Sequence, residues 1–260
     1  MGNHLRELVE AVDAMEHAYY DGMETQSNAN LAVMGVHSLA PQAICFDLGT
    51  DYGVANPVAM PPVEMARLPY PVCWFESTYS DHGIVAGFLC RRSQSVDGAI
   101  DVWSWRREKG LWFCINAWEC DPSDGQSIYF KSLAPTSSWS DEDATEFFGA
   151  LRIVFAAIGV LNCSNIVTRR HDPDAKLQKA RAKRGKQPLF SYHTLEIDPT
   201  ASREAGVDMG GTHASPRVHL RRGHIRQFAP GRYCWVRESV VRGTTPGIVH
   251  KDYAVRPALH

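Results

Sequence analysis

Five short segments rich in aromatic and β-branched residues follow one another in the middle of the sequence. They cover residues 72–78, 83–90, 99–106, 111–119 and 127–132, and residues typical of tight turns separate each from the next. Connections of this length join strands that are neighbours in a sheet and run in opposite directions. This stretch predicts an antiparallel β-meander and limits the fold more than any other part of the chain.

Five tryptophans lie within the predicted meander, at positions 74, 103, 105, 112 and 118. Even spacing places Trp103 and Trp105 on one strand face, and the same spacing places Trp112 and Trp118 together. We interpret these side chains as a core between the sheet and a covering helix. The alternative is a platform for stacking nucleic-acid bases, which the acidic surroundings disfavour.

Helical patterns flank the predicted meander on both sides. Apolar residues recur at helical spacing from about residue 3 to 20, with Asn3 as a possible cap. Ser140 and the acids after it begin a second helix, which should end near Leu161 and pack on the sheet. A strand is expected at 43–48, and a proline-rich extended connector at 56–71. The expected fold class is α+β, an antiparallel β-meander packed with helices.

The charges are divided unevenly along the chain. Residues 166–260 hold 18 Lys or Arg and 8 Asp or Glu, whereas residues 1–165 hold 9 and 21. We therefore expect an acidic helix-plus-antiparallel-sheet region at 1–165 and a basic β-rich region at 166–260. The two regions could also form one compact domain, because opposite net charges attract each other.

The basic region begins with a predicted helix at 172–184. Its cations are Lys176, Lys179, Arg181, Lys183 and Arg184. The sequence Asp172-Pro-Asp174 is typical of a helix start, and Gly185 of a helix end. Strands at 189–197, 216–228, 233–241 and 248–255 should complete a basic C-terminal antiparallel β subregion.

Residues 211–226 contain three histidines, four arginines and no acid. A regular strand here would mix apolar and charged residues on both faces, which a half-buried strand avoids. Gly223 predicts a bulge at 222–223 that reverses the alternation of side chains. The outer face would then carry Arg217, His219, Arg221, His224 and Arg226, and the buried face Val218, Leu220 and Ile225.

This chemistry leaves several interpretations open. One is an anion-binding or nucleic-acid-binding surface, because lysine and arginine bind phosphate. Its residues would be Lys176, Lys179, Arg181, Lys183, Arg184, Arg217, Arg221, Arg222, His224 and Arg226. Another is metal-independent RNA cleavage, with His219 and His224 as base and acid. A third interpretation is a metal site formed by His213, His219 and His224, with Cys234 as a further candidate ligand, but these intervals match no common zinc spacing. In a purely structural alternative, the arginines pair with acids of residues 1–165.

Several familiar motifs are absent from the sequence. It has no Walker A loop, GxGxxG, HExxH or GxSxG, which disfavours nucleotide hydrolases and nicotinamide-dependent enzymes. The seven cysteines include no CxxC pair, so we expect reduced thiols and neither a disulfide framework nor a zinc ribbon. We expect no cofactor and no metal. No apolar run is long enough to span a membrane and no signal pattern is present, so the expected location is cytoplasmic.

Segments 161–167, 176–192 and 215–226, with Trp235-Val236 and 251–253, form a distinctive combination. On these segments, residues 150–256 resemble a family of proteins encoded by tailed phages, prophages and related mobile elements. The resemblance implies a context, the cytoplasm of a host cell, and carries over no catalytic residue. That context favours binding of nucleic acid or inhibition of a host process.

We therefore expect a non-enzymatic phage or mobile-element accessory protein that binds nucleic acid or a host nucleoprotein complex through its basic C-terminal face. The first alternative is a ribonuclease that uses His219 and His224. The second is a protein-directed inhibitor of a host defence system, similar in action to anti-CRISPR proteins, that uses the acidic residues 1–165. The sequence leaves open the oligomeric state, the choice of RNA or DNA, and whether the two regions dock.

Overall fold

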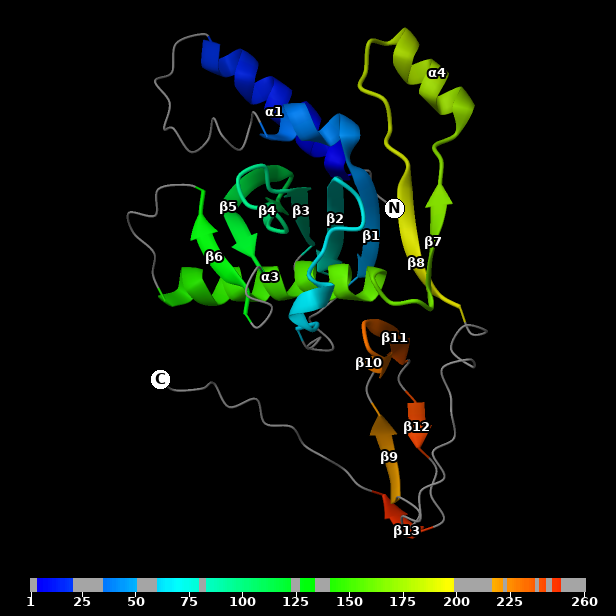
Figure 1. Ribbon diagram of the computed structural model, residues 1–260. Helices are drawn as coiled ribbons and strands as arrows, with labels where there is room; N and C mark the ends of the chain where they lie inside the picture. The colour runs from blue at the N-terminus through cyan, green and yellow to red at the C-terminus, as the bar shows by residue number, and fades with distance from the viewer. Residues whose placement is uncertain are drawn as a thin grey trace.

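The computed structural model of the 260-residue chain describes residues 4–20, 35–50, 60–79, 83–122, 127–133, 141–198, 217–221, 224–236, 239–241 and 245–248. An eight-stranded sheet in the order β6-β5-β4-β3-β2-β1-β8-β7 organises the fold (Figure 1). Its strands are β1 (Ile44–Thr50), β2 (Val72–Tyr79), β3 (Ile84–Arg92), β4 (Ile100–Glu108), β5 (Leu111–Asp121), β6 (Tyr129–Ser132), β7 (Ile166–His171) and β8 (Tyr192–Ile197).

The sheet is mixed, and the fold class is α+β. Strands β2 to β6 each pair antiparallel with the next strand, which confirms the predicted meander. Strand β1 instead pairs in parallel with both β2 and β8, so the expectation of a purely antiparallel sheet is wrong. The connection from Thr50 to Val72 is long enough for the chain to return and begin β2 in the direction of β1.

Strands β7 and β8 follow residue 165 but belong to the same sheet as β1 to β6. They pair antiparallel with each other, and β8 pairs with β1 through Tyr192 and His193. One sheet therefore contains strands from both sides of the boundary expected near residue 165.

The two faces of the sheet pack against different helices. Helix α1 (His4–Tyr20) contributes Leu5, Leu8 and Val12 to a core that includes Trp74. Helix α3 (Asp141–Leu161) packs on the other face, where Phe75 is buried. Neighbouring residues 74 and 75 thus face different helices, as alternation along a strand requires. Among the helices that the structure describes, none has the length and apolar character needed to cross a membrane.

Trp74, Trp103, Trp105 and Trp112 are buried under α1, which confirms their interpretation as core residues. Trp118 is only half-buried and packs on the α3 face. The prediction that it shares a face with Trp112 is therefore wrong. The pairing of β4 with β5 shifts between Ser104 and Trp105, which reverses the alternation along β5.

Trp74 also explains a glycine in the neighbouring strand. A Cβ atom added at Gly87 would lie 2.2 Å from Cη2 of Trp74. The indole is fully buried and cannot move aside, so position 87 requires a residue without a side chain.

The described C-terminal strands lie outside the main sheet. They are β9 (Arg217–Arg221), β10 (His224–Ala229), β11 (Arg232–Val236), β12 (Ser239–Val241) and β13 (Thr245–Ile248). β10 pairs with β11 and β9 with β12, both antiparallel, whereas β13 pairs with β9 in parallel. The parallel pair means that this part, too, is not purely antiparallel. Of the strand expected at 248–255, all but residue 248 lies outside the described residues.

The predicted bulge at 222–223 lies outside the described residues. Before it, Arg221 is opposite Ser239 in the β9–β12 pair, and after it, His224 is opposite Val236 in the β10–β11 pair. The bulge and its effect on the alternation of side chains therefore stay a prediction.

Asn165 fixes the β10–β11 hairpin to the main sheet. Its side-chain Nδ2 donates to the Trp235 carbonyl at 2.8 Å, and its Oδ1 accepts from the Trp235 N–H at 2.7 Å. Ser164 N–H donates to the Tyr233 carbonyl at 2.9 Å, and Tyr233 packs with Met65 and other apolar residues. Two of the segments that carry the family resemblance thus meet at the start of β7, namely 161–167 and 235–236.

Candidate nucleic-acid interface

Helix α4 (Ala175–Lys183) is inserted between β7 and β8 and buries none of its residues. Even its one large apolar residue, Leu177, is 49% exposed. Most helices in proteins are stabilised by burying an apolar face, and α4 has none to bury. Core packing therefore does not account for this helix.

Polar contacts hold α4 in place. Asp174 caps the helix, and its Oδ1 accepts from the N–H groups of Lys176 and Leu177 at 2.8 and 2.9 Å. This confirms the predicted role of the Asp172-Pro-Asp174 segment as a helix start. Gln178 Nε2 donates to the Leu189 carbonyl at 2.8 Å, and Gln178 Oε1 accepts from the Leu189 N–H at 2.9 Å.

The base of the α4 insertion is closed by a carboxylate. Asp172 Oδ1 accepts from Ser191 Oγ and from Arg170 Nε, each at 2.7 Å. The Ser191 hydrogen bond, followed by that from Arg170, lowers the pKa of Asp172 below its ordinary value. The end of β7 is thereby tied to the start of β8.

Arg181 connects α4 to α1. Its Nη2 lies 2.9 Å from Glu10 Oε1, its Nε donates to the Gln187 carbonyl at 2.8 Å, and its side chain is 14% exposed. Gln187 Nε2 also donates to Asp13 Oδ2 at 3.4 Å. Arg181 therefore follows the structural alternative, in which a cation of the basic region pairs with an acid of residues 1–165.

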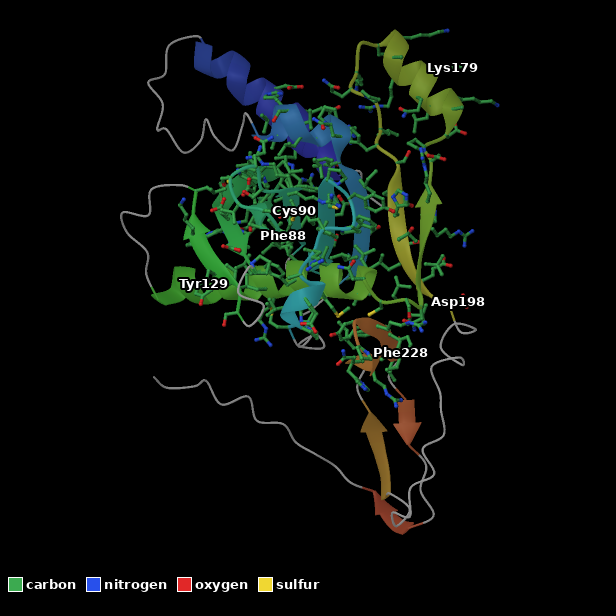
Figure 2. All side chains as sticks on the ribbon, viewed as in Figure 1. Phe88, Cys90, Tyr129, Lys179, Asp198 and Phe228 are labelled. Atoms are coloured by element: carbon green, nitrogen blue, oxygen red, sulfur yellow. The ribbon has the colours of Figure 1, made fainter. Side chains whose placement is uncertain are left out.

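The other cations near α4 face solvent. We define the α4 cationic surface as Lys176, Lys179, Lys183, Arg184 and Lys186, all exposed. None of them forms a salt bridge within the described part of the chain. At about 100° per residue, the three lysines of the helix fall within an arc of about 60°, opposite Gln178 and Arg181. Figure 2 shows Lys179 on this helix, beyond the end of the sheet.

The residues predicted at 217–226 lie elsewhere. Arg226 is exposed and His224 is half-buried on β10, while Arg217, His219 and Arg221 are described by backbone only and Arg222 is not described. Figure 1 shows α4 and β10 beyond opposite ends of β7. Of the expected basic face, His224 and Arg226 thus lie apart from the cations of α4, while the side chains of Arg217, Arg221 and Arg222 are outside the described residues. The reason is β7 itself, which separates the two groups by about 20 Å at 3.3 Å per residue.

The sequence patterns predicted no role for two cations on β7. Arg169 and Arg170 lie on the edge strand of the sheet, with side chains 69% and 63% exposed. The Arg-Arg pair was visible in the sequence, but its place at a sheet edge depends on the pairing of β8 with β1. Only the topology shows that β7 is the edge strand of the sheet among the described strands.

The metal and ribonuclease interpretations gain no support from geometry. Among the residues that the structure describes, no group of three or more His, Cys, Asp or Glu side chains is arranged to hold a metal ion. His213 and the side chain of His219 lie outside the described residues. Cleavage by His219 and His224 therefore stays a prediction.

The most strongly perturbed carboxyl group lies away from α4. Glu76 on β2 is 7% exposed, and its Oε2 accepts from Trp74 Nε1 at 2.7 Å. Burial, with smaller contributions from Asp47 and Glu7, raises the pKa of Glu76 from its ordinary 4.5 to about 8. The group packs under α1 and is part of the core.

Comparison with known proteins gives no match, either to a family model, to a curated protein or to a solved structure.

Proposed function

We propose that the protein binds nucleic acid without catalysis, as an accessory protein of a phage or mobile element, and that the α4 cationic surface makes the phosphate contacts. One observation carries the proposal: α4 is held in place by polar contacts, has no buried residue and, with the two residues Arg184 and Lys186 after it, presents five exposed cations without salt-bridge partners in the described residues. A helix fixed at its base places these cations at set backbone positions, which suits a charged partner with regular spacing, such as a phosphate backbone.

Folding explains only part of these cations, since Lys183 and Arg184 lie at the C-terminal end of α4 and interact favourably with the helix dipole, whereas Lys176, Lys179 and Lys186 have no such role. Exposed charges contribute little to stability, and like charges on one side of a helix repel each other. Lysine also binds phosphate as a point charge, without the bidentate geometry that arginine uses to read guanine. The proposed binding is therefore independent of base sequence.

The test is a binding titration of a labelled 20-base-pair duplex, followed by fluorescence anisotropy at 0.1 M salt. The variant Lys176→Ala/Lys179→Ala/Lys183→Ala should bind up to about 500-fold more weakly, since each phosphate contact contributes about 8-fold at 0.1 M relative to 1 M salt. The variant should keep the unfolding temperature of the wild type, because its three positions are exposed.

The matched control removes three exposed cations elsewhere, in Arg67→Ala/Lys131→Ala/Arg152→Ala. It changes the net charge equally but leaves α4 intact, so it should bind within a few-fold of the wild type. Equal loss in both variants would show a general charge effect. No loss in the α4 variant, or no binding by the wild type at low salt, would refute the proposal.

A further inference from the structure

Cations continue from α4 along β7, the edge strand of the sheet as the structure describes it. Arg169 pairs with Glu196 at 3.6 Å and Arg170 with Asp172 at 2.7 Å, and all four side chains are more than half exposed. Exposed ion pairs of this kind are weak, so a phosphate group can replace Glu196 beside Arg169 at little cost, while the Arg170–Asp172 contact remains part of the base of the α4 insertion. The edge strand is thus a second place where a polyanion can be bound.

A further pair of cations lies beyond the other end of β7. Arg226 and Arg232 are exposed on the β10–β11 hairpin, where the Arg232 guanidinium lies 4.8 Å from the Phe228 ring centroid. Neither forms a salt bridge in the part of the chain that the structure describes. Asn165, fully buried, fixes this hairpin to the residue that precedes β7.

The two outer groups are therefore held at a set separation. Asp172 and Asp174 fix α4 to the end of β7, and Asn165 fixes the hairpin to its start. Figure 1 shows α4 beyond one end of β7 and the β10–β11 hairpin beyond the level of its other end, below α3. Six residues of strand span about 20 Å, which equals about six base pairs of duplex.

We infer that one nucleic-acid duplex lies along the β7 edge, bound at one end by the α4 cationic surface and at the other by Arg226 and Arg232. This inference rests on the proposed function and adds the form of the ligand. With the widths of the helix and the hairpin added to β7, a duplex that reaches both groups needs about 10–12 base pairs. Binding at two ends of one rigid edge makes affinity depend on duplex length, because the second contact becomes intramolecular.

The experiment measures affinity for DNA duplexes of 6, 10, 14 and 20 base pairs at 0.1 M salt. For the wild type, affinity should increase steeply between 6 and 14 base pairs, well beyond the increase expected from the number of binding registers. Above 14 base pairs only that statistical increase should remain. Loss of two phosphate contacts in Arg226→Ala/Arg232→Ala should weaken binding of the longer duplexes up to about 60-fold.

Two comparisons separate this inference from the proposed function. Arg226→Ala/Arg232→Ala should bind the 6-base-pair duplex as the wild type does, and Arg226→Lys/Arg232→Lys should restore the length dependence. If the wild type shows no steep increase, or the alanine variant keeps it, the shared duplex is refuted while α4-dependent binding of the short duplex still stands. If the triple lysine variant binds the short duplex like the wild type, the proposed function itself is refuted.

Discussion

The reciprocal hydrogen bonds of Asn165 should decide whether the β10–β11 hairpin stays on the sheet. Asn165→Ala removes both bonds to Trp235, at 2.8 and 2.7 Å, from a position that is fully buried. The Trp235 N–H and carbonyl then lose their partner at a half-buried site. Two lost bonds with incomplete access to water should cost about 2–4 kcal/mol.

Asn162→Ala provides a matched control three residues earlier. Asn162 Nδ2 also makes two bonds, to the Met65 and Arg67 carbonyls at 2.9 and 2.8 Å, but its side chain is exposed. Water can replace the lost donor, so the expected cost is below about 1 kcal/mol.

Urea denaturation gives the two free energies of unfolding, and hydrogen exchange at residues 233–235 shows where protection is lost. For Asn165→Ala we expect a lower free energy of unfolding together with faster exchange of the Trp235 amide. The amides of β2 to β4 should exchange in the same order, relative to one another, as in the wild type. Equal effects of the two alanine variants would refute the reasoning, because burial is the main difference between them.

Three further predictions concern the core. Glu76→Gln keeps an acceptor for the Trp74 indole. Because the folded-state pKa of Glu76 is raised to about 8, the wild type should lose stability as pH rises from about 4.5 to 8 and the variant should not, which urea denaturation at pH 5 and pH 8 would show. Gly87→Ala should destabilise the fold by about 1–3 kcal/mol through overpacking against Trp74, and an unchanged melting temperature would contradict this packing. A thiol reagent should modify Cys114 rapidly in the native protein and the six buried cysteines only after denaturation, and fast native labelling of more than one thiol would contradict the structure.

Local sequence signals predicted the elements that depend on neighbouring residues. The meander from β2 to β6 follows from turn residues between short strands, and the start of α4 follows from the cap at Asp174. The buried tryptophans follow from size and hydrophobicity, except that the register shift near Trp105 moved Trp118 to the other face. Such a shift depends on how two strands pair and leaves little trace in either strand alone.

The pairing of strands that are far apart in the sequence could not be predicted from local signals. Nothing in 44–50 indicates that β1 lies between β2 and β8, yet that placement makes the sheet mixed and leaves β7 as the edge strand among those described. The bulge inferred from Gly223 lies outside the described residues and stays a prediction. The cations of α4 were identified from sequence, but their separation from Arg226 by the length of β7 was not.

The central claim is that the α4 cations contact phosphate groups, and the salt dependence of binding tests it most directly. The slope of log Kd against log salt, measured from 0.05 to 0.3 M with a 20-base-pair duplex, should become shallower by about 2.7 in Lys176→Ala/Lys179→Ala/Lys183→Ala, or about 0.9 per lysine. The control Arg67→Ala/Lys131→Ala/Arg152→Ala should keep the wild-type slope. A slope unchanged by the α4 substitutions would contradict the account.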